Sequence, residues 1–390
     1  MEESWDGLGP GDLVVVEEPL GPAWPGIVRA AWESGAALLP VDPRLTPGES
    51  TRILERAAAT HRRGSEVELL PLTGGEPVAA DTALVVATSG TSGEPKLVEL
   101  SRDAVAAAVA ASAERIGTGP WLACMPPAHI GGLLVLLRAL LGGRPVVVHD
   151  RFDPGRVAAE PGVTYLSFVP TMLYRLVEHG VDLGRFEAIV VGGAGLPLPL
   201  AERAAASGAR LVRTYGQTES VGGTVYDGVP LEGTGMQVVD GEVWLSGPTL
   251  MRGYRRDPAA TAAVLPGDGW LRTGDGGWIG DDGLLRVSGR LEDAVATGGE
   301  TVWPAEVEAV LREHPGVAEV AVAGAPDPEW GQRAVAFVVP ADPAAPPSLE
   351  DLRAFGAGSL AGYKLPREVR LLQELPRNLV GKVVRRGLIH

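Results

Sequence analysis

The sequence predicts an α/β protein with a large N-terminal domain, built on mainly parallel βαβ sheets with a small β subdomain, and an α+β C-terminal domain. Short apolar runs alternate with Ala- and Leu-rich stretches of helical length as far as about residue 215, which is typical of βαβ units. Short strands punctuated by Gly and Asp begin at about residue 235, and a new alternation follows Gly289-Arg290. A chain of 390 residues has room for two or three domains, and we expect domains at 1–290 and 291–390.

The N-terminal elements follow from their apolar patterns. Apolar runs of strand length predict buried strands at 13–16, 84–87, 145–148, 164–169, 188–191 and 210–213. Stretches with helical length and periodicity lie at 25–34, 102–115, 131–141, 170–179 and 199–207. We expect ligands beyond the carboxyl ends of such strands.

The later elements have a different texture. Runs at 242–245, 278–279 and 284–287 predict a small antiparallel β subdomain. The last 100 or so residues predict a helix at 304–313, strands at 318–322 and 333–338, and a helix at 349–357. The order helix, strand, strand, helix indicates a separate α+β domain.

Composition excludes several classes of function. The net charge is −15 and no basic run stands out, which argues against a nucleic-acid or anionic-membrane partner. Cys124 is the single cysteine, and the six histidines form no H-x-x-x-H pair, so a disulfide or a zinc centre is not expected. The acidic N-terminus lacks a signal-peptide pattern, and the most apolar stretch, 130–148, is interrupted by Arg138, Arg144 and Pro145. We therefore expect a cytoplasmic protein without membrane insertion.

Lysine is rare in this chain. Only three lysines, Lys96, Lys364 and Lys382, stand against 31 arginines. A compact ammonium on a flexible stem does what a planar guanidinium cannot, so retained lysines are candidates for function. Accident and surface positions are the alternatives, and they stay open for Lys364.

A loop rich in Gly, Ser and Thr follows the strand at 84–87. Its candidate phosphate-binding residues are Thr88, Ser89, Gly90, Thr91, Ser92, Gly93 and Lys96. The glycines let backbone N–H groups turn inward, and the hydroxyls add donors, which suits the pyrophosphate end of a nucleotide. Neither a Walker A loop nor a dinucleotide fingerprint is present, and a merely polar loop is the alternative.

Other residues have suitable chemistry near predicted strand ends. Glu219 offers a hard carboxylate oxygen for Mg²⁺ beside the hydroxyl of Thr218, although a solvated loop acid is the alternative. Gly192, Gly193 and Ala194 follow the strand at 188–191 directly, where small residues allow close approach of a base. Tyr215 offers a flat face for adenine, but such a tyrosine is more often part of the core.

These residues belong to a series of motifs in order. The series is Thr88–Lys96, Pro126-Pro-Ala-His129, Gly192-Gly-Ala194, Tyr215-Gly-Gln-Thr-Glu219, Trp270-Leu-Arg-Thr-Gly-Asp275, Gly289-Arg290, Gly298-Gly-Glu300 with Pro304-Ala-Glu306, and Gly381-Lys382. From about residue 11 to the end, the chain resembles the adenylate-forming superfamily of acyl-CoA synthetases, adenylation domains and luciferases. One motif would be weak, whereas eight in order are specific.

The resemblance implies a role for each motif. ATP would be held by the loop from Thr88 to Lys96, by the small residues Gly192, Gly193 and Ala194, and by Tyr215 and Gly216 at the base. Asp275 would accept both ribose hydroxyls, with Arg290 nearby, although Asp in such a turn is usually only a turn former. Thr218, Glu219 and Lys382 would be catalytic, with Lys382 bridging the substrate carboxylate and the α-phosphate. Glu219 would be the ligand of Mg²⁺.

The remaining roles concern the acid and the second half-reaction. By the resemblance, His129, Ile130, Gly222, Gly223 and Thr224 would shape the acyl pocket, although a His after a Pro-Pro turn is more often structural. The C-terminal domain would be mobile, with its hinge at Glu292, where Asp or Lys is more usual. Gly298 and Gly299 would face the thiol of CoA. Cys124 is expected to be buried packing rather than a nucleophile.

The short portion before the phosphate loop, with Leu39-Pro-Val-Asp-Pro-Arg44, and the run 215–230 resemble compact o-succinylbenzoate–CoA ligases of menaquinone biosynthesis. The implied function is activation of a small carboxylic acid by ATP, with pyrophosphate release, and transfer to CoA. Another small-acid or aryl-acid CoA ligase, or a stand-alone enzyme loading a carrier-protein phosphopantetheine, presents the same motifs. A non-catalytic AMP-binding sensor is a remote alternative.

Overall fold

The computed structural model describes residues 5–64, 68–89, 94–377 and 383–389, and the chain divides into two units. The first unit comprises Met1–Gln237, Trp244–Thr273 and Asp281–Leu284, and the second comprises Val238–Val243, Gly274–Gly280 and Leu285–His390. The second unit therefore takes in short pieces from before residue 290. The predicted boundary between an N-terminal domain, 1–290, and a C-terminal domain, 291–390, stays a prediction.

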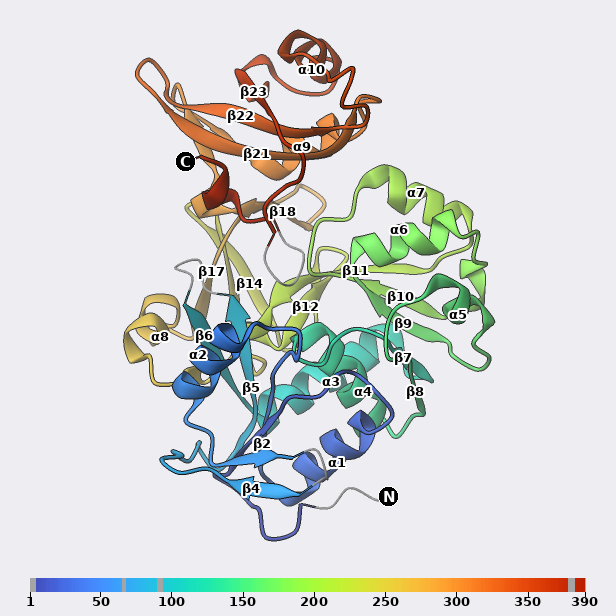
Figure 1. The fold of residues 1–390 in the computed structure, drawn as a ribbon, viewed down its shortest axis with the longest axis vertical. Helices are drawn as coiled ribbons and strands as arrows, with labels where there is room; N and C mark the ends of the chain where they lie inside the picture. Colours follow the sequence, from blue (N-terminus) through green and yellow to red (C-terminus); the bar gives the residue numbers. More distant parts are fainter. Residues whose placement is uncertain (1–4, 65–67, 90–93, 378–382, 390) are drawn as a thin grey trace. The chain divides into compact units, whose positions relative to one another are not determined.

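The first unit contains two seven-stranded sheets within the described residues (Figure 1). The first sheet has the order β16-β6-β5-β2-β1-β3-β4. Its strands are β1 (Leu13–Val16), β2 (Ala37–Pro40), β3 (His61–Arg63), β4 (Leu69–Pro71), β5 (Thr82–Ser89), β6 (Pro95–Ser101) and β16 (Gly253–Tyr254). Strand β1 pairs in parallel with β2 and β3, and β2 with β5, whereas β6 runs antiparallel to β5.

The second sheet has the order β13-β12-β11-β10-β9-β7-β8. Its strands are β7 (Trp121–Ala123), β8 (Val146–Val148), β9 (Tyr165–Phe168), β10 (Ala188–Val191), β11 (Leu211–Gln217), β12 (Gly222–Tyr226) and β13 (Val229–Pro230). Strands β7 to β11 are parallel to their neighbours, and β12 returns antiparallel to β11. The predicted mainly parallel α/β architecture is confirmed.

Helices cover both faces of each sheet in the first unit. The helices are α1 (Trp24–Ser34), α2 (Pro47–Ala57), α3 (Arg102–Ile116), α4 (Ile130–Leu141), α5 (Pro154–Ala159), α6 (Pro170–Glu178), α7 (Leu198–Ala206) and α8 (Pro258–Val264), with a 3₁₀ turn η1 (Leu183–Arg185). Helices α1, α3 and α4 share one core with the inner faces of both sheets, while α6 and α7 pack on the outer face of the second sheet (Figure 1). Alternation along β1 produces this layering, because Val14 and Val16 face the shared core while Leu13 and Val15 face the outer one.

A four-stranded sheet has the order β14-β15-β17-β18, which confirms the predicted small β subdomain. Its strands are β14 (Gly235–Val239), β15 (Glu242–Ser246), β17 (Trp270–Ile279) and β18 (Leu285–Arg290). Strands β17 and β18 are antiparallel. The division between the two units falls within β14, β15 and β17.

The second unit contains the two helices and two strands expected after residue 290, as α9, β21, β22 and α10, together with three strands that were not expected. Its sheet has the order β20-β19-β22-β21, with β23 added beside β22. The elements are β19 (Val295–Thr297), β20 (Glu300–Val302), α9 (Pro304–Leu311), β21 (Val317–Asp327), β22 (Gly331–Pro340), α10 (Leu349–Gly356) and β23 (Glu368–Leu371), with 3₁₀ turns η3 (Leu291–Asp293), η4 (Gly362–Lys364) and η5 (Arg385–Leu388). One sheet face packs on α9 and α10, and the other is covered by Leu375 and Leu388 from the C-terminal segment.

Several elements were not expected from the sequence, and β2, β6 and α2 show why. Strand β2 is only four residues long and ends in proline, and β6 begins with a proline and carries alternating polar residues. Helix α2 contains proline and glycine in its first turn, but a capping box between Thr46 and Glu49 satisfies its N-terminus. Their surroundings, rather than their own apolar content, fix these elements.

Candidate active site

The predicted phosphate loop is the connection of a β-hairpin. Strands β5 and β6 are antiparallel, with Thr88 opposite Lys96, and the Thr88 hydroxyl donates to the Lys96 carbonyl at 3.4 Å. Thr88, Ser89 and Lys96 therefore lie in strands and not in the loop, because the ladder continues to the ends of the motif. Residues 90–93 of the motif lie outside the described residues, as does the side chain of Ser89. The pairing of β5 with β6 fixes the backbone position of Lys96 opposite Thr88.

Glu219 lies in a short 3₁₀ turn, η2 (Thr218–Ser220), between β11 and β12. Its side chain is buried, and among the described residues its carboxylate accepts one hydrogen bond, from the Tyr254 hydroxyl at 2.7 Å. The described residues contain no group of three His, Cys, Asp or Glu side chains that could hold a metal ion. Mg²⁺ in nucleotide sites usually takes one or two carboxylates together with phosphate oxygens, so the lone carboxylate of Glu219 fits that role.

The turn that carries Glu219 is strained. Val221 follows it with φ of 55°, in the left-handed region, and its N–H donates to the Thr218 carbonyl at 3.0 Å. A β-branched residue there costs on the order of 1–3 kcal/mol, and such strain concentrates at functional sites. The Gln217 amide, which donates to the Thr273 carbonyl at 3.1 Å, helps to hold the turn.

The predicted adenine residues lie at the ends of two neighbouring strands. Gly192 follows β10 and Tyr215 lies in β11, and these strands are parallel, so both segments reach the same edge of the sheet. A Cβ atom at Gly216 would lie 2.0 Å from the carbonyl oxygen of Gly222, and one at Gly192 would lie 2.4 Å from the Thr214 hydroxyl. Gly193 and Ala194 continue this segment and are exposed. Close packing alone therefore requires glycine at positions 192 and 216.

The predicted acyl residues come partly together at the start of α4. His129 precedes the helix, Ile130 begins it, and a Cβ atom at Gly222 would lie 3.8 Å from Ile130 and 2.7 Å from Leu134. The neighbouring Gly223 has its α-carbon against Thr214 instead, since a Cβ there would be 2.7 Å from that side chain. Thr224 is fully buried, and its hydroxyl has no hydrogen-bond partner within the described residues.

The surroundings of His129 favour its neutral form. Burial lowers the pKa of His129, the carboxylate of Asp42 opposes that shift, and the guanidinium of Arg44 reinforces it. Its Nε2 atom is buried without a hydrogen-bond partner among the residues the structure describes. Arg44 and Asp42 form a pair in which Nε and Oδ1 are 2.9 Å apart. The sequence Val41-Asp42-Pro43-Arg44 places the two charged residues close together, but their effect on the pKa of His129 could not be predicted from it.

The predicted ribose residues are paired in the second unit. Asp275 of β17 lies opposite Arg290 of β18, and Arg290 Nε is 3.2 Å from Asp275 Oδ1. Asp275 is buried, and its ladder position aims it beside the guanidinium. The structure therefore brings together the two residues that the motifs 270–275 and 289–290 predicted.

The predicted hinge and CoA-side residues are also in the second unit. Glu292 lies in η3, directly after Arg290 and Leu291. Gly298 and Gly299 have φ of 60° and 84° and form the two-residue turn between β19 and β20. Positive φ at both positions of a hairpin turn favours glycine, which accounts for the pair without a ligand.

Of the remaining two lysines, the structure describes only Lys364. Lys382 lies outside the described residues. Lys364 donates to Glu306 in α9 at 2.6 Å, and this hydrogen bond raises the pKa of Lys364. Lys364 therefore has a structural partner within its own unit.

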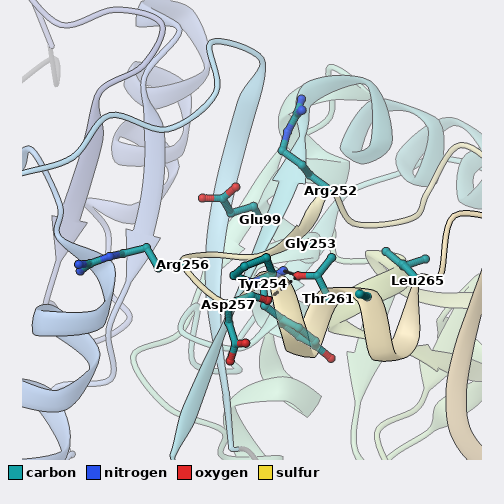
Figure 2. Close-up of a pocket in the computed structure, with 10 residues that line it drawn as sticks. Glu99, Arg252, Gly253, Tyr254, Arg256, Asp257, Thr261 and Leu265 are labelled. Atoms are coloured by element: carbon teal, nitrogen blue, oxygen red, sulfur yellow. Dashed lines mark hydrogen bonds between the residues drawn. The ribbon is translucent and has the colours of Figure 1, made fainter.

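Tyr254 is the residue that sequence analysis missed. Its hydroxyl reaches Glu219, and the Lys96 ammonium lies 4.7 Å from the centre of its ring. Figure 2 shows Tyr254 at an open pocket of about 380 Å³ whose other walls include Glu99, Arg252 and Thr261. None of the predicted site residues lines this pocket. The dipeptide Gly253-Tyr254 did not indicate this role, because Tyr254 and Glu219 are 35 positions apart in the chain.

The two sheets, the β5–β6 hairpin that bears the predicted phosphate motif and the turn that carries Glu219 are features of a nucleotide-binding α/β enzyme. Residues 61–255 match the model of the AMP-binding enzyme family, and residues 306–382 match that of the AMP-binding enzyme C-terminal domain. The chain belongs to the AMP-binding enzyme family. This confirms the superfamily resemblance found in the motifs.

Relatives and solved structures agree with this assignment. The probable 2-succinylbenzoate–CoA ligase of Mycobacterium tuberculosis is 39% identical over 374 residues, covering 92% of this chain and 96% of its own. A feruloyl-CoA synthase of Amycolatopsis is 33% identical, covering 97% and 88%. The o-succinylbenzoate CoA synthetase of Bacillus subtilis, solved with its acyl-adenylate intermediate, superposes with a TM-score of 0.88 at 29% identity, covering 97% and 88%.

In the part of the chain that the structure describes, every helix is too short or too polar to cross a membrane.

Proposed function

We propose that this chain is an ATP-dependent acid–thiol ligase that activates o-succinylbenzoate as its acyl-adenylate and then forms the CoA thioester, a step of menaquinone biosynthesis. The observation that carries the proposal is the segment from Tyr215 to Gly222. It joins the candidate adenine residue to the buried carboxylate of Glu219, and its Gly222 lies near α4, where an added Cβ would be 2.7 Å from Leu134 and 3.8 Å from Ile130. This segment therefore supports a nucleotide subsite and an acyl subsite that lie next to each other.

The chemistry has two steps. A carboxylate oxygen of the acid attacks the α-phosphate of ATP, and the bond to the β-phosphate breaks with release of pyrophosphate. The CoA thiolate then attacks the acyl carbonyl, and AMP leaves. The first step brings anions together, so preorganised cations are the main catalytic device.

The chain's residues have distinct roles in this proposal. Lys382 bridges the carboxylate and the α-phosphate, and Lys96 neutralises the phosphates at the end of the hairpin. Asp275 accepts the ribose hydroxyls, oriented by Arg290 at 3.2 Å. Mg²⁺, when bound with ATP at Glu219, supplies charge neutralisation at the phosphates. Glu292 remains the proposed hinge, and residue 290 the end of the N-terminal domain.

The acyl subsite supports an aromatic acid. Neutral His129 and the apolar side chains of Ile130 and Leu134 present little charge, which suits an aryl ring. The relatives named for 2-succinylbenzoate and for ferulate both support an aryl acid. A cytoplasmic location is part of the proposal, because ATP and CoA are its substrates.

A pyrophosphate-release assay across a panel of acids tests the proposal. The panel holds o-succinylbenzoate, ferulate, a fatty acid and an amino acid, each with and without CoA. We expect the fastest release with o-succinylbenzoate and a thioester only when CoA is present. Faster release with ferulate would support the aryl-acid ligase, and CoA-independent release led by an amino acid would support carrier loading. No release with any acid would favour an AMP-binding sensor.

A further inference from the structure

Tyr254 contacts two groups, Glu219 and Lys96, to which the proposed function gives roles at the nucleotide phosphates. Its hydroxyl donates to Glu219 Oε1 at 2.7 Å, in a contact that is buried. Its ring faces the Lys96 ammonium, which lies 4.7 Å from the ring centre. All three residues belong to the first unit.

The backbone of Tyr254 is fixed independently of these contacts. Strand β16 pairs with β6, with Tyr254 opposite Val98, and the Tyr254 N–H donates to the Thr261 hydroxyl at 2.8 Å (Figure 2). Three residues earlier in the chain, the Met251 N–H donates to the Glu219 carbonyl at 2.8 Å. The ring of Tyr254 therefore projects from a paired strand, and the residues just before that strand hold the backbone of the turn that carries Glu219.

The carboxylate of Glu219 has an uncommon environment. A buried carboxylate is costly unless it is paired or hydrogen-bonded, yet within the described residues Glu219 has only the Tyr254 hydroxyl. One donor orients the carboxylate and leaves most of its acceptor capacity for a cation. The Tyr254 hydroxyl, as a single donor on a rigid ring, is suited to orienting the Glu219 carboxylate.

The cation over the ring adds a second link. An ammonium on an aromatic face is attracted by the electrons of the ring. Among the described residues Lys96 has no carboxylate partner that would compete with a phosphate. The ring holds Lys96 without neutralising it.

We propose that Tyr254 is a positioning residue that orients the Glu219 carboxylate for the divalent cation accompanying ATP and holds the Lys96 ammonium beside it. This inference rests on the proposed use of Mg²⁺ and ATP. It goes beyond that proposal by assigning the residue that links the metal carboxylate to the phosphate lysine.

The test measures ATP binding by titration calorimetry, once in excess Mg²⁺ and once in EDTA. Tyr254→Phe keeps the ring under Lys96 and removes only the hydroxyl. We expect its ATP affinity in Mg²⁺ to fall about tenfold or more, the loss typical of a hydrogen bond to a charged group. Its affinity in EDTA should stay at the wild-type value, which a general structural defect would not spare.

The matched control is Tyr226→Phe. Tyr226 is also a buried tyrosine whose hydroxyl is bonded, to Ser112 at 3.0 Å and Arg138 at 2.9 Å, but it contacts neither Glu219 nor Lys96 through that group. This variant should keep the wild-type ratio of the two affinities. A double-mutant cycle adds Glu219→Gln, in whose background Tyr254→Phe should have little further effect.

Four outcomes would overturn the proposal. They are a wild-type affinity ratio in Tyr254→Phe, an equal loss in Tyr226→Phe, additive losses in the cycle, and a Tyr254→Phe protein that does not fold. The binding measurement is separate from pyrophosphate release. A wild-type protein that binds ATP with Mg²⁺ but activates no acid would contradict the proposed function and leave the Tyr254 measurement decisive.

Discussion

Arg385 and Glu308 form a two-pronged ion pair, with the Arg385 Nη2 atom 2.7 and 2.9 Å from the two carboxylate oxygens of Glu308. Glu308 is buried and also accepts the N–H of Val322 at 2.8 Å. A second nitrogen of Arg385 lies 3.3 Å from Asp293, the residue after the proposed hinge. The pair anchors the chain three residues beyond Lys382.

Removal of Arg385 should destabilise the second unit. Arg385→Ala leaves a buried carboxylate without its cation, so we expect the free energy of unfolding to fall by about 3–5 kcal/mol. Urea unfolding followed by circular dichroism measures the loss. Adding Glu308→Gln should recover part of it, and Arg203→Ala, in an exposed pair with Glu178, should leave the midpoint unchanged. An unchanged midpoint in Arg385→Ala would contradict the ion pair's role.

Lys382→Ala should separate the two half-reactions. We expect acyl-adenylate formation to fall about 10²–10³-fold, since a preorganised cation is lost, while a supplied acyl-adenylate is still passed to CoA. Pyrophosphate release and thioester formation are measured separately. Lys364→Ala is the control, because its ammonium is bonded to Glu306. Adenylation near the wild-type rate in Lys382→Ala would remove this lysine from the mechanism.

His129 should make stability depend on pH. Its pKa is lowered by burial, so the unfolded chain binds more protons than the folded one as the pH falls below about 6.5. Stability contributed by the neutral ring is thus complete above that pH and is lost as the pH falls. Urea midpoints at about pH 5 and pH 7.5 should differ less in His129→Gln than in wild type. Equal differences in both proteins would argue against a buried neutral His129.

Cys124 should be unreactive in the folded protein. Burial raises the pKa of the Cys124 thiol to about 12, and the reactive form is the thiolate. A thiol-specific reagent at about pH 8 should label the protein in denaturant and leave the folded protein unlabelled. Rapid labelling without denaturant would show that the core between the second sheet and its outer helices opens.

Much of the architecture was predictable because it is local. The apolar run at 13–16, the helix at 102–115 and the strand at 188–191 appear within a residue or so of their predicted bounds. Glycines 216 and 298 were also identifiable, because their backbone positions tolerate little else. Strand β6 was missed because its partner β5, rather than its own composition, makes it a strand.

The sequence by itself determined the fold class and the family, since apolar periodicity and ordered motifs are written along the chain. Only the tertiary structure decided which side chains meet. Tyr254 donates to Glu219, which lies 35 positions away in the chain. The charges of Asp42 and Arg44, which follow β2, act on the pKa of His129. Burial and distance set the strength of such contacts, and neither is encoded in the spacing of residues along the chain.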